Sequence, residues 1–140
     1  GVPHHGLGRG FKAGKEEIVG LIVALERFAN SDDEATNASL ALRLKRIAKN
    51  LDNLPGISLQ LVSAKETGRV PQLRILIDVS IAKIDALGLS RALQCADTPV
   101  HLSERFAQHG MLIIDPQVLR VDDEEVLVAT FKAVLPSQLF

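Results

Sequence analysis

Residues 57–79 read ISLQLVSAKETGRVPQLRILIDV, and this stretch decides the fold class. Apolar and polar side chains alternate over 57–62 and again over 72–79, which is the pattern of half-buried strands. Thr67 and Gly68 between the two segments are a turn signal. The stretch therefore predicts an antiparallel pair of strands with one apolar face and one more polar face.

A second pair of strands is expected toward the C-terminus. Residues 99–105 and 110–114 are the two segments, and His109-Gly110 marks the turn between them. Asp115 and a following proline end the second segment. The sequence therefore predicts one antiparallel sheet of about four strands.

Apolar residues spaced three and four apart predict helices around these strands. The long helices are expected to begin near Lys15, Ser31 and Asp122, and a short helix is expected over 86–96. In the second helix, the apolar positions that share one face are Leu40, Leu44, Ile47 and Leu51. The basic residues that largely occupy its other faces are Arg43, Lys45, Arg46 and Lys49. The predicted class is α+β, with helices packed on one face of the antiparallel sheet.

Composition narrows the functional classes. The chain has 140 residues, a formal net charge of −1 and five Phe with no Trp or Tyr, so general affinity for nucleic acid is not expected. Its single cysteine, Cys95, excludes an internal disulfide and is expected in the core. No apolar run approaches the roughly 20 residues that cross a membrane, and no signal-peptide core is visible, so a cytoplasmic location is expected.

The histidines do not form a convincing metal site. His4 and His5 are adjacent but have no carboxylate at ligand spacing, and His101, Glu104 and His109 form only a weak set. The sequence also contains no recognisable Ser/His/Asp or paired-carboxylate arrangement. We therefore predict no metal site and no catalytic residue on this chain.

The glycine-rich stretch GLGRGFKAGKEE, residues 6–17, places cations just before the first helix. A dinucleotide-binding loop would need a preceding strand, which is absent from the predicted elements. Arg9 and Lys12 instead lie where glycines allow a close approach and where a helix N-terminus favours anions. They are predicted to bind a carboxylate or phosphate, and the alternative is that both are solvated surface cations.

The stretch GRGFKAGKEEIVGLIVALERF, residues 8–28, resembles a motif of pyridoxal-phosphate enzymes related to selenocysteine synthase (L-seryl-tRNA selenium transferase). The nearer relatives resemble the D-glucosaminate-6-phosphate ammonia-lyase group. The similarity continues downstream through three further segments, which are NLPGISLQLV at 53–62, RVPQLRILID at 69–78 and TPVHLSERFAQHGMLIIDPQVL at 98–119. It therefore covers nearly the whole chain.

This resemblance implies the small C-terminal domain of a fold type I (aspartate-aminotransferase type) enzyme. Residues 1–14 would lead in from a large catalytic domain that is missing here, and 15–140 would form the small α+β domain. The family's Schiff-base lysine lies in the large domain, so this chain is expected to bind no cofactor and to have no activity alone. The intact parent would be a pyridoxal-phosphate-dependent lyase or transferase, and a homo-oligomer.

The resemblance also assigns a role to the two cations. In the selenium transferase branch, cations at the Arg9 and Lys12 positions meet anionic groups in the active-site cleft. Arg9 matches in type, whereas Lys12 replaces an arginine of that branch and matches the lysine usual in the ammonia-lyase branch. The implied ligand is a small anionic substrate, an amino acid or amino sugar acid.

Two other functions are considered. The chain could be a stand-alone α+β binding or dimerisation module without catalytic activity. Binding of tRNA, as in the selenium transferase itself, is disfavoured by the near-neutral charge and by the shortage of aromatic residues.

Overall fold

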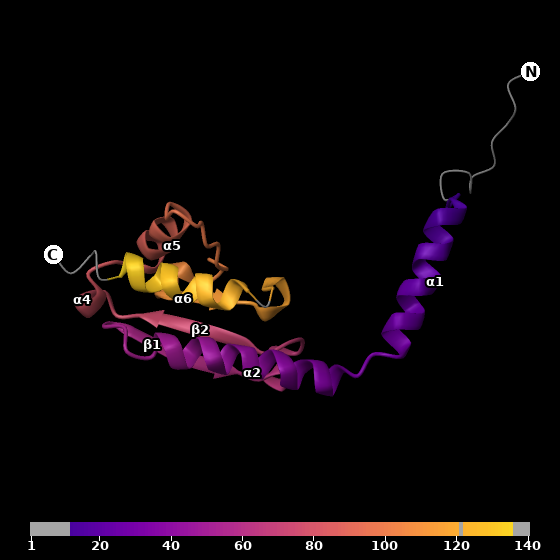
Figure 1. Cartoon of the computed structure of the whole chain (residues 1–140), viewed down its shortest axis with the longest axis horizontal. Coiled ribbons are helices and arrows are strands. Elements are labelled where there is room, and N and C mark those ends of the chain that lie inside the picture. Colours follow the sequence, from indigo (N-terminus) through magenta and orange to yellow (C-terminus); the bar gives the residue numbers. More distant parts are fainter. Residues whose placement is uncertain (1–11, 121, 136–140) are drawn as a thin grey trace, which may run out of the picture. The chain divides into compact units, whose positions relative to one another are not determined.

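The structure is a computed structural model, and it describes residues 12–120 and 122–135 (Figure 1). The chain divides into two compact units, Gly1–Asp33 and Glu34–Phe140. Each unit is described below by itself.

The first unit contains helix α1, Lys15–Ala29. Glu16 and Glu17 lie in its first turn, where acidic side chains offset the positive end of the helix dipole. Asn30 ends the helix, and its side-chain amide donates to the Glu26 carbonyl at 2.8 Å. No residue of α1 is buried, although the helix is rich in apolar side chains.

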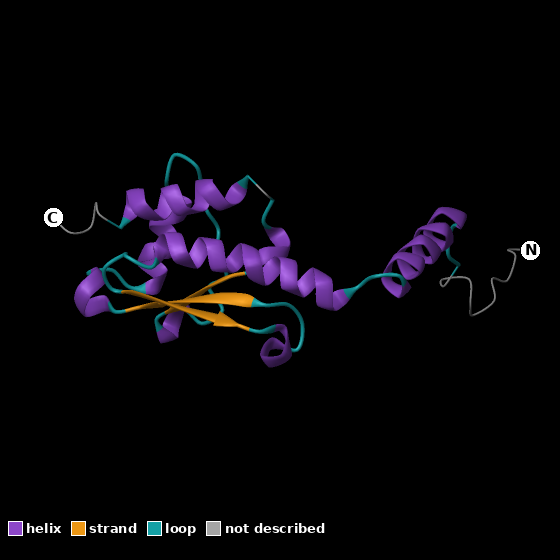
Figure 2. Cartoon of the chain, turned by 60° about the horizontal axis from the view of Figure 1, so that its bottom comes forward, coloured by secondary structure: helices purple, strands orange, loops and turns teal. Residues whose placement is uncertain are grey.

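The second unit is built on an antiparallel sheet of three strands in the order β1-β2-β3. The strands are β1 Ile57–Val62, β2 Gln72–Ile77 and β3 Met111–Ile114. Leu59 pairs with Ile75, which in turn pairs with Leu112, so the apolar positions of all three strands share one face. In both views α2, Asp33–Leu51, runs alongside this sheet (Figure 2). The predicted class and the β1–β2 pairing are confirmed.

The sheet has three strands rather than about four, because the prediction of a strand over 99–105 is wrong. Only Ser103 pairs there, through an isolated bridge to Ile113. The neighbouring Glu104 carboxylate instead accepts hydrogen bonds from Ser90 Oγ at 2.7 Å and from Gln94 Nε2 at 3.0 Å. These bonds draw the segment toward α5, Ala86–Gln94, and away from a regular ladder.

The second predicted strand also ends earlier than expected. Asp78 accepts a hydrogen bond from the Ser80 backbone N–H at 2.9 Å, which caps the short helix α4, Val79–Ala82. At the same end of the sheet, Gly56 precedes β1 and accepts a hydrogen bond from the Asp78 backbone N–H at 2.8 Å. Gly56 has φ +74°, and a Cβ there would lie 2.5 Å from the Ala82 nitrogen. Only glycine fits that position without a shift of the backbone.

The remaining elements complete the second unit. They are the short helix α3 Ala64–Thr67, the 3-10 helices η2 Ala107–His109 and η3 Pro116–Val118, and the final helix α6 Asp123–Val134. The expected helix starts near Ser31 and Asp122 therefore agree with α2 and α6 to within two residues.

The core lies between the apolar face of the sheet and helices α2, α5 and α6. Its fully buried helical residues include Leu44, Ile47, Leu51, Leu89, Leu93 and Phe131. They pack with the inward residues of β2 and β3, which are Leu73, Ile75, Ile77, Leu112 and Ile114. The apolar stripes predicted for these helices are the surfaces that they bury. Helix α1 contributes no residue to this cluster.

Candidate functional site

The predicted anion site can be followed only in part. Arg9 lies outside the described residues, whereas Lys12 is described and its side chain is exposed just before α1. A carboxylate of α1 already occupies the N-terminus of the helix, because the Gly14 backbone N–H donates to Glu17 Oε2 at 2.5 Å. An external anion would therefore depend on the two cationic side chains more than on the free N–H groups of the helix.

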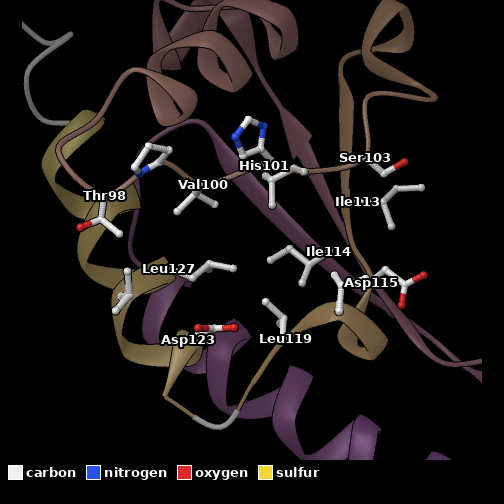
Figure 3. Close-up of a pocket in the computed structure, with 14 residues that line it drawn as sticks. Thr98, Val100, His101, Ser103, Ile113, Ile114, Asp115, Leu119, Asp123 and Leu127 are labelled. Carbon is white, nitrogen blue, oxygen red and sulfur yellow. The ribbon is translucent and has the colours of Figure 1, made fainter.

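A pocket of about 450 Å³ opens in the second unit, which is within the size range of small-molecule sites (Figure 3). Its walls come from the segment 98–103, the end of β3, the residues after η3, and the first half of α6. The principal apolar lining residues are Val100, Leu102, Ile114, Leu119, Val126 and Leu127. Periodicity did not identify this pocket, because most of the segment that forms this wall belongs to the strand predicted over 99–105.

One wall of the pocket is held by a clamp centred on Arg43. Its Nε donates to Glu124 at 2.7 Å, and its terminal nitrogens donate to the carbonyls of Leu119 at 2.9 Å and Arg120 at 2.6 Å. Arg46 donates to the same carboxylate at 2.9 and 3.1 Å. Because Leu119 lines the pocket, the clamp between α2 and α6 also fixes the pocket wall.

The clamp changes the titration of its carboxylate. The hydrogen bond from Arg46 is the largest cause lowering the pKa of Glu124 below its usual value. Partial burial of the carboxyl opposes that shift, and the hydrogen bond from Arg43 adds to it. Arg43 matters more for stability, because its side chain is 15% exposed whereas that of Arg46 is 59% exposed. Both arginines were expected on faces of α2 other than its apolar stripe, and Arg43 is partly buried there by its contacts with Glu124 and with the carbonyls of Leu119 and Arg120.

The opposite wall is fixed by the contacts that replaced the expected strand. Ser103 and Ile113 exchange backbone hydrogen bonds at 3.0 and 3.1 Å. The buried Ser90 hydroxyl holds Glu104 next to them. Both walls are thus held by hydrogen bonds within the second unit, so the pocket is preorganised.

The polar groups around the pocket do not form a catalytic set. Figure 3 shows the Asp123 carboxylate beside the apolar residues Leu119 and Leu127, while the Asp115 carboxylate points away. No hydrogen bond joins Ser103, His101 and either aspartate in the described part of the chain, so they do not form a Ser-His-Asp triad. The pocket can hold an aliphatic group, but it offers no nucleophile activated by a base.

Two other sequence predictions concern the position of Cys95 and the metal-ligating residues. Cys95 is exposed at the end of α5, so the expectation that it lies in the core is wrong. Over residues 12–120 and 122–135, no three His, Cys, Asp or Glu side chains are gathered as metal ligands. His4 and His5 lie outside these ranges. None of the helices in the described ranges has the length and apolarity required to cross a bilayer.

Comparison with known proteins identifies relatives that match most of the chain, although no family model matches it. The chain is 25% identical over 132 residues to 5'-C-glycyluridine monooxygenase-decarboxylase from Streptomyces sp, a match that covers 94% of this chain and 33% of that protein. It is 23% identical over 132 residues to D-glucosaminate-6-phosphate ammonia lyase from Salmonella typhimurium, covering 94% of this chain and 34% of the relative.

A solved structure shares the fold. The structure of D-glucosaminate-6-phosphate ammonia-lyase superposes with a TM-score of 0.73 and 21% identity, over 96% of this chain and 36% of the other. The similarity to D-glucosaminate-6-phosphate ammonia-lyase expected from the sequence is confirmed. The chain spans about a third of the length of the curated relatives that it matches.

Proposed function

We propose that this chain is the C-terminal small domain of a pyridoxal-phosphate-dependent lyase or transferase that acts on an amino acid or amino sugar acid. Arg9 and Lys12 bind an anionic group of the substrate in that enzyme. The supporting observation is that nearly all of this chain matches about a third of each of two enzymes. A stand-alone module would be matched by relatives of its own length.

The names of the two relatives support the substrate class but not a single reaction. One relative is named as an ammonia lyase acting on a glucosaminate phosphate, and the other as a monooxygenase-decarboxylase acting on a glycyluridine. A decarboxylation and a glucosaminate both imply a carboxylate on the substrate. A carboxylate matches the planar fork of an arginine such as Arg9.

The described part of this chain does not by itself fit pyridoxal phosphate. That cofactor is held through a lysine amine and supplies an electron sink to the reaction when it is bound. Every lysine of the described ranges is exposed, and these are Lys12, Lys15, Lys45, Lys49, Lys65, Lys83 and Lys132. We therefore assign the cofactor site, and the contacts of a homo-oligomer, to the other two-thirds of the whole protein. The proposal also includes a cytoplasmic location for the whole protein.

The test of this proposal is cofactor binding by the whole protein. The purified whole protein should carry pyridoxal phosphate, seen as visible absorbance, and borohydride reduction should fix it to a lysine outside this chain. A whole protein that neither copurifies with the cofactor nor binds it on addition would contradict the proposal.

The isolated chain provides a second prediction. After incubation with pyridoxal phosphate and borohydride, intact-mass analysis should show no stoichiometric adduct at a single lysine. The reason is that every described lysine is exposed and reacts with the cofactor without a binding site that retains it. The reduced whole protein, digested in parallel, is the positive control. A single modified lysine in the chain, Lys12 above all, would show that the cofactor site lies here instead.

A further inference from the structure

Within its own unit, helix α1 presents an apolar surface that no other described residue of that unit covers. Its large apolar side chains are between 45% and 73% exposed, and none of its residues is buried. A main strip follows the helix at spacings of three and four residues and consists of Ile18, Leu21, Ile22, Leu25 and Phe28. Soluble proteins rarely leave such a continuous apolar surface in water.

The apolar surface is wider than one strip. Val19 and Val23 form a second pair, one turn apart, at 59% and 45% exposure. At 100° per residue the two sets together occupy roughly two-thirds of the helix circumference. A helix lying on a single surface needs an apolar stripe of only about 100°, so α1 has the pattern of a helix that is enclosed.

The core of the second unit does not require α1. Sixteen buried residues form that core, and none of them belongs to α1. The match to each relative includes at least part of α1, because it leaves out fewer residues than α1 contains. These relatives extend for about twice the length of this chain beyond the match.

We infer that the apolar surface of α1 is a docking surface for the part of the whole protein that lies outside this chain. The inference rests on the proposed function, which supplies the remaining part of the whole protein. It deepens that proposal by naming this part as the partner of α1. The docked helix also places the segment that carries Arg9 and Lys12, which directly precedes α1, against the same partner.

The first measurement compares hydrogen exchange of α1 amides in the isolated chain and in the whole protein. Docking should slow exchange over Lys15–Ala29 by more than about tenfold in the whole protein, because exposed helices open locally at little cost. Equal exchange in both proteins would overturn the inference. This comparison uses unaltered proteins and does not depend on the folding of a variant.

The second measurement uses the variant Leu21→Gln/Leu25→Gln, since glutamine keeps the helix propensity of leucine nearly unchanged. In the whole protein it should raise the unfolding equilibrium constant by on the order of 10- to 100-fold per leucine. In the isolated chain it should leave the unfolding midpoint of the second unit unchanged. The control Glu16→Gln/Arg27→Gln places two glutamines on the polar side of the same helix. It removes only exposed charges that interact with the helix dipole, so it should have a small effect that is the same in both proteins.

The other occupants of this surface give different results. If the leucine substitutions destabilise the isolated chain as much as the whole protein, the surface is covered by the second unit. If the isolated chain is a dimer that the leucine substitutions dissociate and the control substitutions do not, and the whole protein is unaffected, the surface is covered by a second copy of the chain. Either result would overturn the inference. Cofactor binding by the whole protein is scored separately, so a failure of the proposed function is distinguished from a failure of α1 docking.

Discussion

Replacing Arg43 by methionine is expected to lower the free energy of unfolding of this chain by about 3 kcal/mol. The Arg43 side chain is only 15% exposed, and its guanidinium donates to Glu124 and to the carbonyls of Leu119 and Arg120. Methionine retains the apolar stem but leaves these acceptors without their donor. The loss is measured by denaturant unfolding, with the change in midpoint read at a constant slope.

Arg46 provides the matched control, because it donates to the same carboxylate from the same helix. Its side chain is 59% exposed, so water replaces its hydrogen bonds in the variant Arg46→Met. The expected loss is below about 1 kcal/mol, as for other exposed ion pairs. Equal losses in the two variants would show that burial does not decide the strength of this clamp.

The clamp also predicts how stability depends on pH. Since hydrogen bonds from Arg46 and Arg43 lower the pKa of Glu124, its contribution is fully present above the unfolded value of about 4.3. That contribution is lost as the pH falls through the lower folded-state pKa. The stability difference between the unaltered chain and Glu124→Gln should therefore shrink in acid, and a difference that is constant from neutral pH to acid pH would contradict the assignment.

Periodicity located most of the fold, because the second unit is stabilised by apolar faces that alternate or recur along the sequence. The strand at 57–62 and the buried stripe of α2 are examples, since each exposes one face to the core. The segment 99–105 has similar alternation but pairs only at Ser103. Its position is decided by the contact of Glu104 with Ser90, fourteen residues earlier, and such a side-chain contact leaves no periodic signal.

The candidate site was harder to predict for the same reason. Arg43 holds one wall of the pocket by reaching residues more than seventy positions later in the chain, and the spacing of residues along α2 gives no sign of such a contact. Cys95 was misplaced because it follows the last residue of the short helix α5 as its C-cap, next to a turn, where its side chain is open to solvent. Arg9 and Lys12 could be proposed as an anion site because glycines and charges adjacent in sequence are a local signal, and this assignment stays a prediction.

Replacing Arg9 by alanine in the whole protein is expected to reduce kcat/KM by roughly tenfold to a few hundredfold. Under the proposed function the guanidinium forms charge-assisted hydrogen bonds with a substrate carboxylate or phosphate. Such bonds contribute about 1.5–3 kcal/mol each, which converts to that range of catalytic efficiency. The variant Arg9→Lys should recover part of the loss, because lysine retains the charge but not the bidentate geometry.

The unfolding midpoint separates this role from a structural one. Arg9 lies outside the described residues, and its proposed partner is the substrate rather than the core, so the midpoint should barely change in Arg9→Ala. The matched control is Arg27→Ala, which removes an arginine from the last turn of α1 and should leave kcat/KM unchanged. Unchanged kinetics in Arg9→Ala would leave Arg9 a solvated surface cation, whereas a large fall in the midpoint would make it structural. A kinetic loss without a stability loss is the result that anion binding requires, because only the complex with substrate contains the lost bonds.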